Sequence, residues 1–146
     1  MIGLIQRVTS ANVSVDSEVV GTIGQGIVVL VGFQKPDTPE LIPKFIERVL
    51  SFRVFSDTHG KMNLSVVDKA AGVLWVPQFT LAADTKSGRR PSFSSALAPM
   101  KAKELFGELQ EEAKKAHVHS DFGCFGAHMH VSLINNGPVT FWLEVD

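Results

Sequence analysis

Residues 27–31 form an unbroken apolar run, Ile27-Val28-Val29-Leu30-Val31, in which four of the five side chains are β-branched. Such a run is typical of a buried strand. Even when it is extended to Phe33 it is strand-sized, well short of the ~20 apolar residues that a membrane helix needs. The run therefore indicates a fold built around a buried β-strand.

Several other segments have the composition of strands. Residues 2–15 are rich in β-branched residues and partly alternate, so they predict one or two strands, and three glycines at 21, 24 and 26 mark a turn region after them. Further strands are predicted over residues 72–81, 129–134 and 139–145. Asn135-Asn136-Gly137-Pro138 separates the last two and predicts a tight turn there.

Two segments have helical periodicity. Asp37-Thr38-Pro39-Glu40 resembles a capping box, but Pro43 moves the first regular turn to about Ile42. The second helix begins near Pro99, and six apolar residues share its inner face, at positions 102, 105, 106, 109, 113 and 116. Together the elements predict an α+β fold with mostly antiparallel strands and two main helices, in one domain over residues 1–146.

Composition narrows the class of protein. Fourteen basic and fifteen acidic residues leave a formal net charge of −1, which argues against a non-specific nucleic-acid binder. One cysteine excludes an internal disulfide and suits a reducing compartment, and the first residues do not resemble a signal peptide. A cytoplasmic protein without a membrane segment is expected.

Three stretches are candidates for a functional site. In Gly137-Pro138 the proline is either trans at the first corner of a turn or cis at the second, and the residues alone favour trans because cis occurs in only ~5–6% of X–Pro bonds. In the stretch from Trp75 to Leu81, Pro77 places the strand at an edge or ends it. Strand alternation then puts Gln78 and Thr80 on one side, either as a polar strand end or as a pair at the mouth of a pocket.

The third stretch, residues 86–94, combines two adjacent arginines with hydroxyls, a glycine and an aromatic ring. It suits phosphate contact and base stacking, or is simply a solvated loop.

Other catalytic arrangements have weaker support. His117-x-His119 and His128-x-His130 would place four imidazoles on strand faces as potential zinc ligands, although histidines on a partly exposed strand are common. Cys124 has apolar neighbours and is expected to pack rather than to act as a nucleophile. There is no G-x-S-x-G elbow, no H-E-x-x-H motif and no evident Ser-His-acid triad.

Four motifs taken together resemble one known family. They are Met1-Ile2-x-Leu4-Ile5-Gln6-Arg7-Val8, Gln78-Phe79-Thr80-Leu81-Ala82, Arg90-Pro91-Ser92-Phe93 and Asn136-Gly137-Pro138-Val139-Thr140. They occur in this order in the D-aminoacyl-tRNA deacylases, and the resemblance runs from the first residue to the last. It implies a barrel-like core and hydrolysis of the ester bond of D-aminoacyl-tRNA, with glycyl-tRNA as an expected second substrate.

The resemblance also implies a shared active site. The family is a homodimer in which a cis Gly-Pro, here Gly137-Pro138, enters the partner's pocket and its carbonyls accept the substrate's α-ammonium. A D side chain then points outward, whereas an L side chain would collide with the backbone. Arg7 matches the arginine that braces this loop, and Phe79 and Phe125 match aromatics around the terminal adenosine.

By the same resemblance Gln78 and Thr80 match the polar pair of the catalytic motif, with nearby backbone N–H groups as an oxyanion hole. No base accompanies Thr80 in the motif, so the 2′-hydroxyl of the terminal adenosine is expected to help activate water, with no metal, no cofactor and no further protein partner. One departure is Pro77, which stands where the family usually has serine. Two rival functions are a non-catalytic nucleic-acid-binding module on the same fold and a metal-dependent hydrolase built on the histidines.

Overall fold

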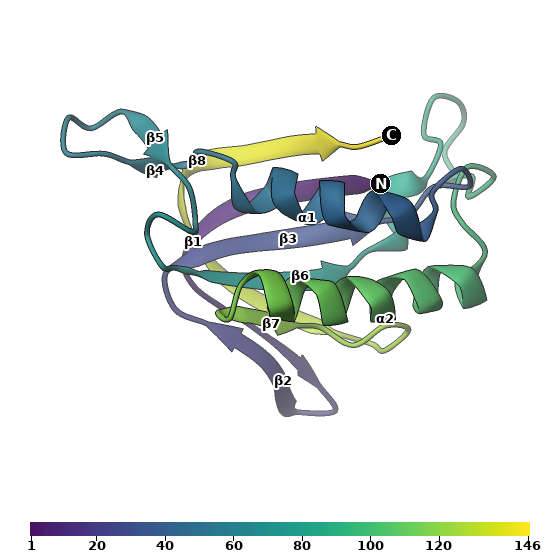
Figure 1. Cartoon of the computed structure of the whole chain (residues 1–146). Coiled ribbons are helices and arrows are strands. Elements are labelled where there is room, and N and C mark those ends of the chain that lie inside the picture. Colours follow the sequence, from purple (N-terminus) through teal and green to yellow (C-terminus); the bar gives the residue numbers. More distant parts are fainter.

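The computed structural model describes residues 1–146 as one large curved sheet whose two main helices lie side by side on one face (Figure 1). The elements in chain order are β1 (Ile2–Val15), β2 (Glu18–Ile23), β3 (Gly26–Gly32), η1 (Pro39–Leu41), α1 (Ile42–Leu50), β4 (Phe55–Ser56), β5 (Met62–Leu64), β6 (Gly72–Pro77), η2 (Phe79–Ala82), α2 (Pro99–Ala116), β7 (Ser120–Phe122) and β8 (His130–Glu144). Neither helix is long and apolar enough to span a membrane.

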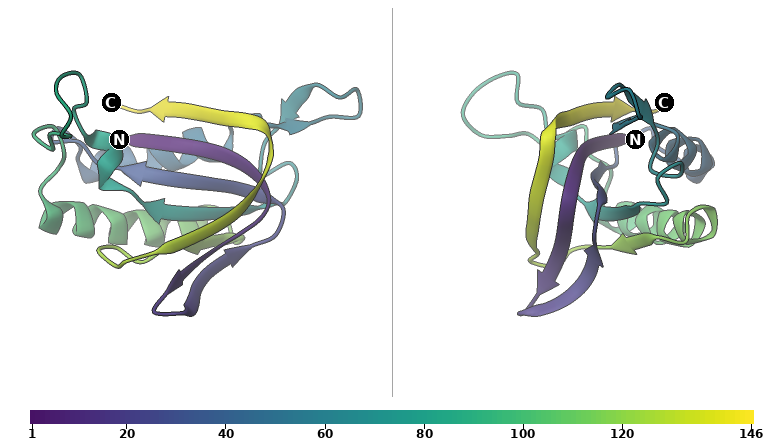
Figure 2. Two further views of the ribbon diagram at one scale, coloured as in Figure 1. Left: turned by 180° about the vertical axis from the view of Figure 1, so that it is seen from behind. Right: turned by 90° about the vertical axis from the view of Figure 1, so that its left-hand side faces the viewer.

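The sheet is organised around the long strand β1. Its strand order is β2-β1-β3-β6-β7, and β8 pairs with β1 in addition. The first half of β1 pairs with β3 and its second half with β2, while β8 follows β1 along almost its full length. The β1–β8 ribbon therefore curls around the sheet and nearly closes it (Figure 2). The predicted α+β fold with a barrel-like core is confirmed.

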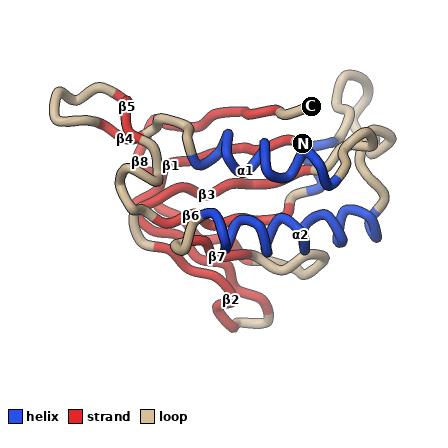
Figure 3. The backbone as a smooth tube through the Cα atoms, in the orientation of Figure 1, coloured by secondary structure: helices blue, strands red, loops and turns tan.

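Most strand pairs are antiparallel, as predicted, but the two pairs that involve β6, which are β3–β6 and β6–β7, are parallel. The return connections that a parallel pair requires are supplied by α1 between β3 and β6 and by α2 between β6 and β7 (Figure 3). The strands β3 and β6 approach so closely at their starts that a Cβ on Gly26 would lie 1.9 Å from the carbonyl oxygen of Gly72. Only glycine fits at this position.

The apolar run that begins at Ile27 is buried on both faces of the sheet, as its composition predicts. Val29 and Val31 belong to the main core beneath the helices, whereas Val28 belongs to a second cluster on the opposite face. The second cluster also contains Val8, Ala11, Val13, Leu74 and Val76. The helix faces follow the predicted periodicity, except that Ala116 at the end of α2 is exposed.

The predicted turn over residues 135–138 is wrong, because the chain does not reverse there. Strand β8 runs continuously from His130 to Glu144, and both of its halves pair antiparallel with β1. The register jumps between Gln6↔Thr140 and Val8↔Asn135, so residues 136–139 bulge out of the strand opposite Arg7. Long-range pairing with β1 overrides the local turn signal of Asn-Gly-Pro.

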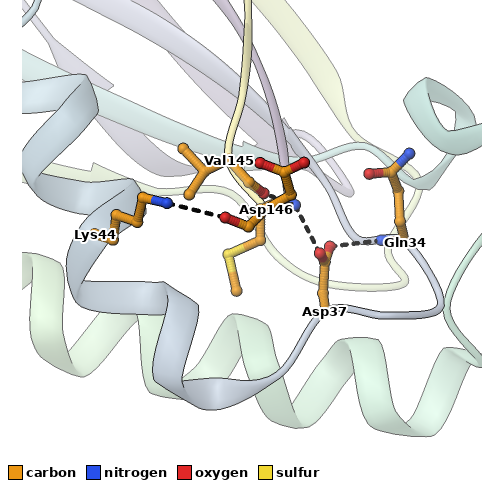
Figure 4. A network of polar contacts seen from close by, with 6 residues as sticks. Gln34, Asp37, Lys44, Val145 and Asp146 are labelled. Atoms are coloured by element: carbon orange, nitrogen blue, oxygen red, sulfur yellow. Dashed lines mark hydrogen bonds and ion pairs between the residues drawn. The ribbon is translucent and has the colours of Figure 1, made fainter.

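The predicted capping box at Asp37 is also wrong. The residue that precedes the first helical turn is Thr38, and no side chain caps it. Instead, the buried Asp37 carboxylate accepts hydrogen bonds from the Met1 ammonium and from the backbone N of Gln34, both at 2.7 Å (Figure 4). The Met1 ammonium also donates to the carbonyl oxygen of Val145 at 2.6 Å, so Met1 links Asp37 to the residue that follows β8.

Candidate active site

A cavity of about 460 Å³ opens beyond the end of β6. Three segments contribute to its wall: the end of β6 with the start of η2, the start of α2 with Leu97 two residues before it, and the loop leading into β8 with the strand's beginning. The lining residues are Val76, Pro77, Gln78, Phe79, Leu97, Pro99, Ala102, Phe125, Gly126, Ala127, His128, Met129 and Val131. The predicted site residues Gln78, Phe79 and Phe125 are therefore brought together.

The turn after Pro77 shapes one side of this cavity. Strand β6 ends at Pro77, which confirms one of the two alternatives for this proline, and β6 lies between β3 and β7 rather than at an edge. The predicted continuation of the strand to residue 81 is wrong, because Phe79–Ala82 form the 3-10 turn η2. The backbone N of Gln78 donates to the carbonyl oxygen of Val31 at 2.7 Å, which anchors the turn to the end of β3.

Gln78 and Thr80 do meet, although not through strand alternation. The Nε2 of Gln78 donates a hydrogen bond to the Oγ1 of Thr80. A carboxamide is not a base, so this contact orients the threonine hydroxyl without activating it. Thr80 is not among the lining residues, but its hydrogen bond with Gln78, which is, holds it next to the cavity.

Two of the predicted aromatic residues present rings to the cavity. Phe79 is 57% exposed, and its ring centroid lies 5.1 Å from that of Phe93. Phe125 is half-buried and packs against Phe106 of α2, with centroids 6.2 Å apart. An exposed aromatic beside an apolar cavity is suited to stacking on a nucleobase.

The β8 bulge holds the other group of predicted site residues. Gly137 and Pro138 are exposed, and the peptide bond between them is cis rather than the trans bond that the residues alone favoured. Arg7 donates from Nε to the carbonyl oxygen of Asn136 at 2.8 Å and from Nη1 to that of Val54 at 2.6 Å. Arg7 thus fixes the base of the bulge to the segment before β4.

Within one chain, the bulge and the cavity lie at opposite ends of β3. Arg7, beside the bulge, pairs with Ile27 at the start of β3. Gln78, at the cavity, follows Pro77, which pairs with Val31 near the end of β3. The predicted site residues therefore form two separate groups, Gln78, Phe79, Thr80 and Phe125 on the one hand and Arg7, Gly137 and Pro138 on the other.

Several cavity residues had no signal in the sequence. Leu97, Ala102 and Met129 line the cavity, yet each resembles an ordinary core residue of a helix or strand. Their role as wall residues depends on how α2 and the loop before β8 pack against the end of β6. The spacing of residues within a single sequence does not predict that packing.

The histidines and the cysteine differ from their predictions. His117 ends α2, where its Nε2 contacts the carbonyl oxygen of Ala71 at 2.7 Å, and His119 precedes β7, so this pair is not on a strand. The two histidine pairs remain separate, and no three His, Cys, Asp or Glu side chains form a metal-ligating group. Cys124 is exposed rather than packed.

Comparison with known proteins assigns the family. A family model described as D-Tyr-tRNA(Tyr) deacylase matches residues 4–144. The chain belongs to this family. A member from Thioalkalivibrio sulfidiphilus (strain HL-EbGR7), named D-aminoacyl-tRNA deacylase, is 53% identical over 145 residues, which cover 99% of this chain and 97% of the relative. Members with the same name from Janthinobacterium sp. (strain Marseille) and Escherichia coli O1:K1 are 54% and 50% identical over 145 residues. Membership of this deacylase family makes the chain a hydrolase.

Solved structures of similar proteins share the family fold. One, named "c-Myc DNA Unwinding Element Binding Protein", is 37% identical with a TM-score of 0.94, covering 100% of this chain and 99% of that chain. Another, described as a probable eukaryotic D-amino acid tRNA deacylase, has a TM-score of 0.87 and covers 99% of this chain and 98% of that chain. At 17% identity this second likeness concerns the fold alone.

Proposed function

We propose that this chain hydrolyses the ester bond of D-aminoacyl-tRNA in the cytoplasm, releasing the D-amino acid and the tRNA, and spares L-aminoacyl-tRNA. The proposal is carried by relatives named D-aminoacyl-tRNA deacylase that are about half identical over nearly the whole chain. The cavity beside η2 supports it, because Phe79 and Phe125 offer aromatic rings where a terminal adenosine would bind.

The proposed active site is shared between two copies of the chain. The bulge at Gly137-Pro138 cannot complete the cavity of its own chain, because the two lie at opposite ends of β3. Strand β8 also exposes large apolar side chains on either side of the bulge, with Ile134 62% and Trp142 53% exposed. Apolar residues gathered on an exposed surface are typical of an interface, so a two-fold homodimer would bury them and insert each bulge into the partner's cavity.

In this dimer the carbonyl oxygens of Gly137 and Pro138 accept hydrogen bonds from the substrate's α-ammonium. With the ammonium and the ester both fixed, the third substituent of the α-carbon has one free direction. A D side chain occupies that direction, whereas an L side chain meets backbone. Glycine has no side chain to reject, so glycyl-tRNA would also be hydrolysed.

Hydrolysis would then depend on positioning and electrostatics. Backbone N–H groups at Phe79 and Thr80 stabilise the oxyanion, since that of Gln78 is bonded to Val31, and the 2′-hydroxyl of the terminal adenosine helps to activate water, without a metal or a cofactor. The side chain that contacts the Thr80 hydroxyl is the Gln78 carboxamide, which is not a base, and this supports a non-covalent role. Pro77 supplies neither the hydroxyl nor the N–H of the usual serine, so the other groups of the turn must suffice.

The proposal is tested by incubating the purified protein with D-tyrosyl-tRNA and L-tyrosyl-tRNA side by side, with and without a chelator. Release of D-tyrosine alone, at a rate that the chelator does not change, is the expected result. Light scattering at the assay concentration should give the mass of a dimer. Equal rates on both isomers, or an active monomer, would contradict the chiral gate or the shared site respectively.

A second candidate function is nucleic-acid binding without catalysis. It is favoured by the 37% identical structure, whose name is that of a protein that binds a DNA unwinding element. Binding of a single-stranded DNA together with no release of D-tyrosine would support this candidate. A chelator-sensitive release would instead support hydrolysis by a histidine-bound metal.

A further inference from the structure

A compact basic loop projects from the structure between η2 and α2. Its neck is closed by two backbone hydrogen bonds between Asp84 and Ser92, at 2.7 and 3.0 Å. The loop lies at the end of the molecule opposite the β4–β5 hairpin (Figures 1 and 2). It therefore leaves the sheet at the same end as the cavity beside η2.

The loop concentrates positive charge in a chain whose formal net charge is −1. Lys86, Arg89 and Arg90 are all exposed, and none takes part in the three ion pairs of the structure. The only carboxylate between residues 83 and 98 is that of Asp84, which accepts a hydrogen bond from the backbone N of Lys86 at 2.9 Å. Two guanidinium groups and one ammonium are thus free to bind an anion.

The base of the loop is attached to the rim of the cavity. Phe93, just after the neck, packs its ring against Phe79 of the cavity wall at 5.1 Å between centroids. The Oγ of Ser95 donates to the carbonyl oxygen of Ala82 at 2.6 Å, and the backbone N of Leu97 donates to that of Phe33 at 3.0 Å. These contacts fix the base of the loop beside the opening where the terminal nucleoside would enter, so the cations are carried by a segment attached to that rim.

We propose that Lys86, Arg89 and Arg90 bind the backbone phosphates of the single-stranded 3′ end of the RNA whose terminal nucleoside occupies the cavity. The inference rests on the proposed function. Guanidinium groups form charge-assisted hydrogen bonds with phosphate, and each phosphate that is neutralised releases bound counterions. Binding through this loop is independent of base sequence, so the loop contributes affinity for the RNA and leaves the choice between D and L residues to the Gly137-Pro138 bulge that enters the cavity.

The test is the double variant Arg89→Gln/Arg90→Gln assayed on two substrates. On D-tyrosyl-tRNA its KM should rise so that kcat/KM falls on the order of tenfold near 0.2 M monovalent salt, with kcat unchanged. On D-tyrosyl-adenosine, which lacks phosphates, the variant and the parent should react equally. Equal losses on both substrates, or no loss on the tRNA, would overturn the proposal.

A binding measurement separates the loop from the catalytic question. The affinity of a fluorescent single-stranded RNA ending in CCA is measured against salt concentration. The logarithm of the association constant falls as the logarithm of the salt concentration rises. In the double variant this fall should be less steep by about 1.4, since each single-strand phosphate contact contributes about 0.7 to the steepness. An unchanged slope would overturn the proposal about the loop, whether or not the protein hydrolyses either substrate. Absence of hydrolysis would refute the proposed function and would leave the salt slope as a separate test of the loop.

Two matched variants complete the design. Arg89→Lys/Arg90→Lys keeps both charges and should retain the salt slope. Lys61→Gln/Lys115→Gln removes two exposed charges on the turn before β5 and on α2, away from the loop, and should leave KM for the tRNA unchanged. If this second pair weakens tRNA binding as much as the arginine pair, the effect is one of overall charge and the loop has no special role.

Discussion

The Nε of Arg7 donates a hydrogen bond to the carbonyl oxygen of Asn136 at 2.8 Å, and this contact holds the β8 bulge against β1 at the point where their register breaks. The same guanidinium donates to the carbonyl oxygen of Val54. One half-buried side chain therefore fixes the direction in which Gly137 and Pro138 leave the sheet.

Arg7→Ala should lower D-aminoacyl-tRNA hydrolysis on the order of 10²-fold, because a bulge displaced by about 1 Å no longer positions the substrate. Arg7→Lys should give a smaller loss, since an ammonium cannot keep the fork geometry that reaches both carbonyl oxygens. The measurement is kcat/KM on D-tyrosyl-tRNA, with circular dichroism to show that the fold is kept. Arg53→Ala, which removes a single exposed contact with Asn63, is the control. Full activity of Arg7→Ala would show that the bulge needs no brace.

Gly137→Ala tests whether the bulge enters a second copy of the cavity. Within its own chain an added Cβ would have one close neighbour, the backbone N of Val139 at 3.0 Å. Thermal unfolding should change little, whereas activity should fall on the order of 10²-fold because the methyl group enters the space of the substrate. Gly107→Ala is the control, since its Cβ on α2 would meet no atom within 4 Å. That control should keep activity and gain about 0.5–1 kcal/mol of stability.

Thr80→Ala should retain activity within about tenfold, because the Gln78 carboxamide that contacts the hydroxyl is not a base and cannot activate it. Rapid quenching of a reaction with labelled D-tyrosyl-tRNA should recover no acyl-protein from either form. A trapped acyl-threonine, or a loss on the order of 10⁴-fold as for an essential nucleophile, would require a covalent mechanism.

Asp37→Asn should reduce the free energy of unfolding by about 3–5 kcal/mol, the usual effect of removing one partner of a buried ion pair. The exposed fractions of the Met1 and Asp37 side chains are 0% and 2%, so water cannot replace the lost charge. Urea unfolding of the two proteins measures the difference. Asp57→Asn, in the exposed turn after β4, should cost much less, and equal effects would show that the ion pair contributes little.

Asp68 provides a prediction about pH. Hydrogen bonds from the backbone N and then from the Oγ of Ser65 lower the pKa of its carboxyl group. Because the folded pKa lies below the unfolded one, the stabilisation is present at neutral pH and is lost as the pH falls below about 4. The stability difference between the parent and Asp68→Asn should therefore shrink on acidification. A difference that grows at low pH would contradict the assignment.

The sequence motifs predict which residues lie together at the cavity better than they predict the conformation of those residues. Gln78, Phe79 and Phe125 were predicted together and do share a cavity. Their arrangement was predicted wrongly, because alternation assumes that the strand continues past Pro77, whereas the chain forms η2. The change from strand to turn depends on Gln78 bonding to Val31, a residue 47 positions away in the chain.

What the sequence by itself determined is the set of elements whose signal is local. The buried strand around Val29 and the first turn of α1 at Ile42 follow from apolar runs, periodicity and a proline, and all three act within a few residues. Only the tertiary structure decided that β8 passes through Asn136 without turning and that Asp37 binds the Met1 ammonium. In both cases a partner more than 35 residues away offers a stronger interaction than the local motif does. The free energy of the local conformation is outweighed by strand pairing in β8 and by the ion pair with the Met1 ammonium at Asp37.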